Sequence, residues 1–164
     1  MAACFLLIFA IGIYMADLPR TASHRLFLYD THKSFGMLVL GLLFIRIVLL
    51  LRVLLHQRKP SGQQRFWLKT TMLHTLLYGF MLIVPLTGYL YSSTAGSHVP
   101  FFGLQIPLLF PENANKIDVA RNTHFWFAYS FLILIVLHVL VQRKFLKTVG
   151  QRIAKRFKRD IAKH

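Results

Sequence analysis

The sequence contains little cysteine and few acidic residues. Cys4 is the one cysteine among 164 residues and lies in an apolar segment, which excludes a disulfide framework and a thiolate metal cluster. Five acidic residues leave little for proton-relay chemistry, and the sequence has no Ser/His/Asp triad, glycine-rich phosphate loop or paired catalytic carboxylates. These absences exclude the common hydrolytic and phosphate-binding classes.

Hydrophobic and basic residues dominate instead. The chain is 55% hydrophobic and 14% aromatic, and its formal net charge is +15. Such a composition is typical of a membrane protein rather than a soluble domain. The basic residues stand beside apolar segments, where membrane topology and anionic lipid explain them more simply than nucleic acid does.

Four apolar segments predict an all-α integral membrane protein, a four-transmembrane-helix up-and-down bundle. They cover residues 2–15, 30–55, 71–91 and 122–141. The first lacks the basic start and the cleavage site of a signal peptide. Pro85 in the third is tolerated in a membrane helix, because neighbouring helices re-satisfy the freed carbonyl.

The connecting segments are distinct in composition. Residues 56–69 form a basic loop, whereas residues 92–116 contain too much glycine and proline to span and predict a re-entrant or surface-lying loop. From residue 142 basic and apolar residues alternate, which predicts a surface amphipathic helix. The sequence therefore divides into a membrane domain, 1–142, and a basic cytoplasmic tail, 143–164.

Lysine and arginine also predict the orientation. They concentrate in the loop between the second and third segments and in the tail, so that loop and both termini should be cytoplasmic. His32 and His124 would then lie near the outer surface, and His74 and His138 near the inner one.

Two histidines of the fourth segment carry the strongest functional signal. His124 and His138 are fourteen residues apart. At about 100° and ~1.5 Å per residue they face within roughly 40° of each other and lie ~21 Å apart along a helix. Imidazole is a common axial ligand of haem iron, and one helix can carry ligands for two cofactors. The alternative is that both histidines are packing residues.

The second segment repeats this spacing with His32 and Arg46. His32 comes level with His124 and makes with it a candidate bis-imidazole pair for an outer haem, where Gly36 would let the flat macrocycle approach the backbone. Arg46 comes level with His138, and a haem propionate or a quinone oxygen would suit its guanidinium. The alternative for Arg46 is a side chain that extends to the inner surface.

Five stretches of the sequence, which together cover roughly residues 12–139, resemble the bacterial cytochrome b561 family. They read IGIYMADLP, THKSFGMLVLGLLFIRIVLLL, MLHTLLYGFMLIVPLTGYLYSSTAG, VPFFGLQIP and HFWFAYSFLILIVLHV. This family shares its haem-binding bundle with the cytochrome b subunits of nickel hydrogenases. The resemblance implies a bacterial inner-membrane protein with two b haems and electron exchange with membrane quinone. The outer haem would use His32 and His124, and the inner would use His138 and a histidine of the first helix.

The sequence departs from that pattern at its start. The family's first-helix ligand stands in a His-Trp-Leu-Met-like run whose methionine aligns with Met1, so the histidine would lie three residues earlier. Either the start was assigned at an internal methionine, or the inner haem lacks this ligand. We expect one firmly bound haem, and a second if the upstream histidine exists. His74, at a position that the family also fills, is a candidate for a quinone contact, a proton-linked role or a substitute ligand.

Three functional hypotheses follow. The first is a b-type cytochrome, an electron-transfer oxidoreductase that links an outer donor to ubiquinone; at least one family type is understood to oxidise superoxide in this way. The second is a haem-bearing anchor for a redox partner subunit of a dehydrogenase or hydrogenase, and the third is a non-redox bundle with structural histidines. Four basic residues that flank the outer site would focus a small anionic donor there, namely Arg20, Arg25, Lys33 and Arg121.

Overall fold

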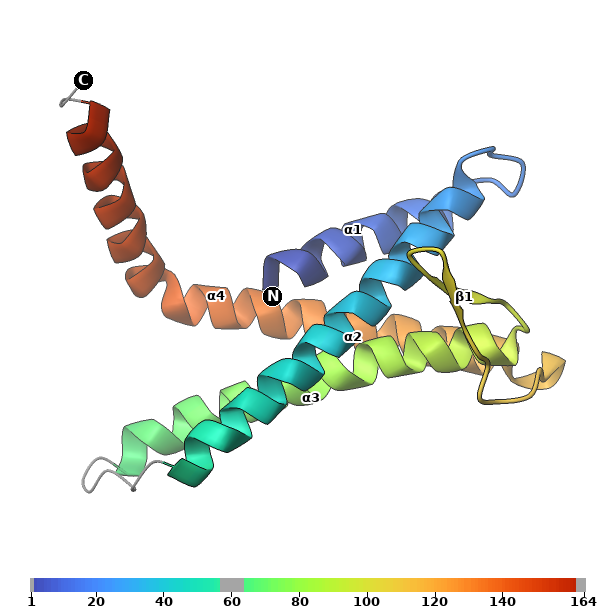
Figure 1. The fold of residues 1–164 in the computed structure, drawn as a ribbon, viewed down its shortest axis with the longest axis horizontal. Coiled ribbons are helices and arrows are strands. Elements are labelled where there is room, and N and C mark those ends of the chain that lie inside the picture. Colours follow the sequence, from blue (N-terminus) through green and yellow to red (C-terminus); the bar gives the residue numbers. More distant parts are fainter. Residues whose placement is uncertain (1, 57–63, 162–164) are drawn as a thin grey trace.

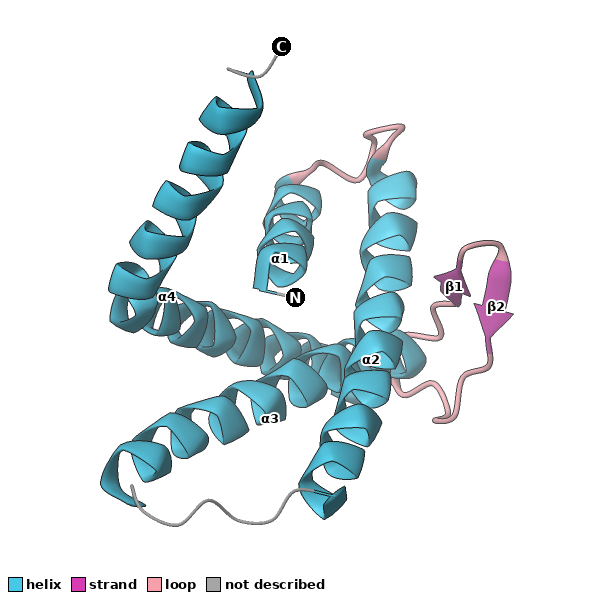
Figure 2. Ribbon diagram, turned by 60° about the vertical axis from the view of Figure 1, so that its left-hand side comes forward, coloured by secondary structure: helices cyan, strands magenta, loops and turns pink. Residues whose placement is uncertain are grey.

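The structure, a computed structural model, describes residues 2–56 and 64–161 and is mainly helical, as predicted. Its four helices are α1 (Ala2–Asp17), α2 (Arg25–His56), α3 (Gln64–Thr94) and α4 (Ile117–Ile161). Successive helices run in opposite directions, so the α1–α2 and α3–α4 connections lie at one end of the molecule (Figures 1 and 2).

Three helices are long and apolar enough to cross a membrane. The candidate spans are Arg25–Arg52, Leu73–Thr94 and Ala114–Leu140, and α1 contributes a shorter apolar helix, Ala3–Asp17. A helix of about 20 apolar residues matches the ~30 Å hydrocarbon layer. Large apolar side chains such as Phe44, Leu51 and Ile133 are exposed on the outside of these helices. This pattern fits a helical membrane protein whose outer surface contacts lipid.

The helices extend beyond the predicted apolar segments. α2 begins at Arg25, five residues before the predicted start, and α3 begins at Gln64, inside the segment predicted to be a loop. The residues added to α2 are mostly apolar and belong to the candidate span Arg25–Arg52, whereas α3 begins in polar sequence. At the start of α2, Arg25 donates a hydrogen bond of 3.1 Å to Tyr29 one turn later. The predicted fourth span and tail are likewise one continuous helix, α4, which changes direction along its length (Figure 1).

A β-hairpin corrects the prediction of a purely helical fold and lies within residues 92–116, the segment predicted as a re-entrant or surface-lying loop. Strand β1 (Val99–Phe101) pairs antiparallel with β2 (Leu104–Ile106), with Val99 opposite Ile106. The turn uses two residues with positive φ, Phe102 at 48° and Gly103 at 94°. Such a turn favours glycine and lets the chain reverse between the strands. A short 3-10 helix, η1 (Ala114–Lys116), then leads into α4.

Two consecutive side chains of α2 attach the hairpin segment to the bundle. Lys33 Nζ donates to Ser97 Oγ at 2.7 Å and to the backbone oxygen of His98 at 2.8 Å. Ser34 Oγ donates to the Pro100 carbonyl at 3.0 Å. The connection between α3 and α4 is therefore fixed to α2 next to His32.

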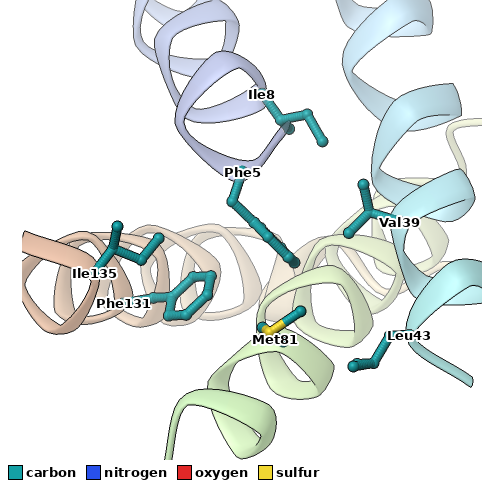
Figure 3. Packing of buried hydrophobic residues seen from close by; sticks show 7 residues of the cluster. All are labelled: Phe5, Ile8, Val39, Leu43, Met81, Phe131 and Ile135. Carbon is teal, nitrogen blue, oxygen red and sulfur yellow. The ribbon is translucent and has the colours of Figure 1, made fainter. Parts of the chain in front are cut away.

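The buried core draws on all four helices. Figure 3 shows its members: Phe5 and Ile8 of α1, Val39 and Leu43 of α2, Met81 of α3, and Phe131 and Ile135 of α4. The rings of Phe5 and Phe131 meet edge to face, with centroids 4.9 Å apart. Val39 and Phe131 lie seven residues, or two helical turns, from His32 and His124. The core thus lies two helical turns along α2 and α4 from His32 and His124.

Candidate functional site

The structure brings the rings of His32 of α2 and His124 of α4 next to each other. Their ring centroids are 6.3 Å apart, and the ring planes are nearly perpendicular, at 84°. The two residues are 92 positions apart in the sequence (124 minus 32). The predicted pairing of these two histidines therefore exists in the folded chain.

Each ring is anchored by its Nδ1 atom to a backbone carbonyl of another helix. His32 Nδ1 lies 3.0 Å from the Ile8 oxygen, and His124 Nδ1 lies 3.1 Å from the Val84 oxygen. Thr87 Oγ1, which donates to the same Val84 oxygen, is 3.2 Å from His124 Nδ1. Because a carbonyl only accepts, these hydrogen bonds require the proton on Nδ1 and leave the Nε2 lone pair available.

Both histidines line a cavity of about 250 Å³ between the helices. Its walls are mostly apolar and aromatic and include Phe5, Phe9, Phe125, Leu132 and Ile135. A second group of lining residues carries polar or charged side chains: Asp17, Tyr29, Tyr91 and Arg121. An apolar cavity with a few polar groups is the usual form of a cofactor site.

The residues fit a haem group. A metal–imidazole bond is about 2 Å long, which places each ring centroid roughly 3 Å from a metal held between the two Nε2 atoms. The observed separation of 6.3 Å matches two such bonds. Nδ1 bonded to a carbonyl is also the common outer-shell arrangement of a ligating histidine. Gly36 lines the cavity, and a Cβ added there would meet no atom within 4 Å, so a flat ligand has room beside it.

Among the described residues, no group of three or more His, Cys, Asp or Glu side chains could hold a metal ion. Two opposed imidazoles instead suit a metal that brings its equatorial donors with it, as haem iron does.

His74 of α3 and His138 of α4 form a second histidine pair. Their ring centroids are 5.4 Å apart, at an interplanar angle of 80°. The rings are thus 0.9 Å closer than those of His32 and His124 (6.3 against 5.4 Å). The sequence predicted that both residues lie near one surface and named His74 as a candidate substitute ligand beside His138, and the structure places the two rings in contact.

Arg46 lies outside the cavity that holds His32 and His124. Its side chain is exposed, and its guanidinium stands over the ring of Tyr78 of α3, 5.5 Å from the centroid. This is a cation–π contact. Tyr78 follows His74 by one turn, so Arg46 belongs to the same half of the bundle as the second histidine pair.

The four basic residues predicted around the outer site take different roles. Arg121 lines the cavity and pairs with Asp118 at 3.1 Å. Arg25 contacts Tyr29, Lys33 binds the hairpin segment, and Arg20 is exposed in the α1–α2 connection. Arg121 is the member of this group that reaches the cavity.

Two glycines that the sequence did not single out contact His32 and His124. A Cβ on Gly12 would lie 3.0 Å from His32 Cε1, and one on Gly88 would lie 3.0 Å from His124 Cε1. Glycine inside an apolar helix signals a close approach, but it does not identify the approaching side chain.

Comparison with known proteins identifies the family of the chain. Residues 1–152 match the family described as prokaryotic cytochrome b561. The chain is 30% identical over 136 residues to cytochrome b561 homolog 2 of Escherichia coli (strain K12), an alignment that covers 79% of this chain and 70% of that protein. These matches agree with the apolar helices of the structure, and the chain belongs to the prokaryotic cytochrome b561 family, the membrane b-type cytochromes of electron transfer.

Proposed function

We propose that His32 and His124 are the axial ligands of one haem b, and that the chain passes electrons from a donor at the outer surface to a membrane quinone. The observation that carries this proposal is the opposed pair of imidazoles, 6.3 Å apart, with both Nδ1 atoms bonded to backbone carbonyls. A haem bound there supplies reversible one-electron transfer.

The residues around the outer site define its environment. The carbonyls of Ile8 and Val84 hold the Nδ1 protons, so Nε2 of each ring would be the nitrogen that binds the haem. Apolar walls exclude water from the space between the rings, while Arg121 offers a cation that suits the carboxylates of a bound group. The chain thereby orients its ligand and sets the polarity around it.

His138 is proposed as a ligand of a second haem near the inner surface. His74 beside it is proposed as either the opposing ligand or a quinone contact, and Arg46 as a donor to a quinone oxygen or a propionate. Reduction of a quinone to a quinol needs two electrons and two protons, and imidazole can deliver a proton near neutral pH. The contact of the two rings and the position of Arg46 at Tyr78 support a site in this half of the bundle, and the 5.4 Å separation, shorter than the 6.3 Å that matches two metal–imidazole bonds, favours the quinone contact for His74.

Superoxide is the proposed outer donor. Each superoxide ion gives up one electron and becomes dioxygen, so two ions supply the electrons that one quinone needs. A small anion fits a site whose polar lining includes Arg121, and the protein as a whole carries a net charge of +15.

Replacement of the outer ligands tests the haem site. We expect His32→Ala and His124→Ala each to remove one low-spin haem per chain, because either change leaves the iron with a single protein ligand. A pyridine haemochrome assay and the reduced-minus-oxidised spectrum measure this loss. His56→Ala is the matched control, since His56 is exposed at the end of α2.

A rescue experiment separates ligand loss from misfolding. In His124→Gly, added imidazole should restore the low-spin spectrum if the variant keeps its fold. Full haem content and an unchanged spectrum in both alanine variants would contradict the assignment of His32 and His124.

A further inference from the structure

The contact of His32 with α1 involves two residues one helical turn apart. The Ile8 oxygen accepts the hydrogen bond from His32 Nδ1 at 3.0 Å. Gly12, four residues later, faces the same ring: an added Cβ would lie 3.0 Å from Cε1 and 3.4 Å from Nδ1. The imidazole therefore occupies the space that a side chain at position 12 would need.

The contact of His124 with α3 repeats this arrangement. The Val84 oxygen lies 3.1 Å from His124 Nδ1, and Gly88 is again four residues later. A Cβ on Gly88 would lie 3.0 Å from Cε1 and 3.2 Å from Nδ1. Two different helices thus present the same pair, a carbonyl at one position and a glycine four residues on, to the two histidines.

Helix geometry explains the spacing of four. In an α-helix the N–H of residue i+4 is bonded to the carbonyl of residue i, and the Cα–Cβ bond tilts back toward that preceding turn. A side chain at i+4 therefore stands beside the carbonyl and limits access to its second lone pair. With glycine at i+4 the carbonyl can accept a second hydrogen bond from a ring on another helix.

Gly12 and Gly88 differ from two other helical glycines in the space around them. Gly41 and Gly79 lie within α2 and α3, and a Cβ at either would meet no atom within 4 Å. Glycine at those positions is not required by close packing within the chain. The two glycines next to the ligand rings are tightly enclosed, which ties them to the histidines.

We propose that Ile8–Gly12 and Val84–Gly88 are positioning pairs for the two axial histidines. In each pair the glycine admits the imidazole edge, and the carbonyl holds the Nδ1 proton, so that Nε2 is the ligand nitrogen. This proposal rests on the proposed haem site and adds the residues that set the orientation and basicity of its ligands. A carbonyl bonded to Nδ1 raises the basicity of the ligating nitrogen.

Alanine at the two glycines tests the proposal. A methyl group 3.0 Å from Cε1 must displace the ring and lengthen its bond to the carbonyl. We expect Gly12→Ala and Gly88→Ala each to lower the retention of the outer haem by about tenfold or more, the range seen when outer-shell partners of metal ligands are lost. Haem that remains should be easier to reduce, with a tenfold change in the ferric-to-ferrous ratio, equal to a 59 mV upward shift of the midpoint potential.

Gly41→Ala and Gly79→Ala are the matched controls, and both should keep the haem content and potential of the unaltered protein. Haem titration, the low-spin signal and potentiometry are the readouts. If Gly12→Ala and Gly88→Ala behave like these controls, the proposal is overturned. Equal losses in all four variants would also overturn it, because they would indicate a general sensitivity of the helices to glycine replacement.

A measurement on the haem-free full chain tests this proposal separately from the proposed function. It also tests the proposal if the alanine variants fail to fold. In ¹⁵N-histidine NMR, protonated Nδ1 and bare Nε2 at His32 and His124 support the positioning pairs. Protonated Nε2 at these residues overturns them. Haem retention in His32→Ala and His124→Ala, by contrast, would refute the ligand assignment and leave the tautomer result standing.

Discussion

Individual side chains at the outer site depend on backbone atoms for their orientation. His32 and His124 are held by carbonyls of Ile8 and Val84 rather than by carboxylates. A backbone acceptor survives most substitutions at its own position, because the carbonyl remains when the side chain changes. We therefore expect the identity of residues 8 and 84 to matter less to ligand orientation than the glycines at 12 and 88.

The charge of Arg121 gives a prediction about the donor. Arg121 lines the cavity and is exposed, so its field reaches an approaching anion through solvent. We expect Arg121→Glu to slow reduction by superoxide by about threefold or more at low ionic strength, and we expect the rate of the unaltered protein to fall as salt is added. Stopped-flow reduction measured across a salt series checks both effects.

Arg52→Glu is the control for that measurement. Arg52 is exposed near the end of α2 that lies far from the α1–α2 connection. It makes the same change in net charge without altering the cavity. A rate that is indifferent to salt, or equal slowing in both variants, would argue against focusing by Arg121 and would favour the role of an anchor subunit with a protein donor.

At the level of elements, the hairpin is the part whose attachment can be tested most directly. Lys33→Met combined with Ser34→Ala removes the three hydrogen bonds that fix residues 97–100 to α2. We expect unfolding in detergent to become easier by about 1–3 kcal/mol, since each such bond contributes on the order of 1 kcal/mol. The haem bands should persist, because His32 keeps its contact with Ile8.

Thermal unfolding followed by the haem absorption measures that difference. Lys116→Met, at an exposed position of η1, controls for the loss of a positive charge. An unchanged midpoint of unfolding in the double variant would show that the attachment contributes nothing to stability.

The elements differ in how far the sequence could predict them. Apolar runs predicted four helices because burial in lipid requires continuous apolar sequence, and this requirement leaves a strong pattern. The ends were less well predicted: α2 begins at Arg25, five residues before the predicted start, and the added residues include the apolar Leu26, Phe27 and Leu28. The hairpin at residues 99–106 was missed since its two strands have three residues each and depend on contacts with α2.

The candidate site could likewise be predicted only in part from the sequence. The spacing of fourteen residues relates His124 to His138 and His32 to Arg46, and it placed His32 level with His124, because periodicity along one helix can be read directly. The partners of these histidines lie on other helices, and no spacing within one segment relates Ile8 to His32 or Val84 to His124. Such cross-helix contacts need the packed structure.

For the whole molecule, the predicted orientation places both termini in the cytoplasm, with the hairpin and the α1–α2 connection outside. In a Cys4→Ser background, Asn115→Cys in η1 should react with a membrane-impermeant maleimide in intact cells. His56→Cys, at the opposite end of α2, should react only after the membrane is permeabilised. Both positions are exposed, so accessibility within the fold is matched. The reverse labelling pattern would invert the topology and place the outer site inside.

The distribution of the outer site over the chain has a consequence for biogenesis. Ile8 and His32 belong to the first two helices, and Val84 and His124 belong to the last two. Each half of the chain therefore contains one histidine together with the carbonyl that orients it. During synthesis from the N-terminus, the first half can orient its imidazole while the second is still being made. The two histidines come together only when α4 has been made and brings His124 next to His32, so the complete site forms after the last helix joins the core.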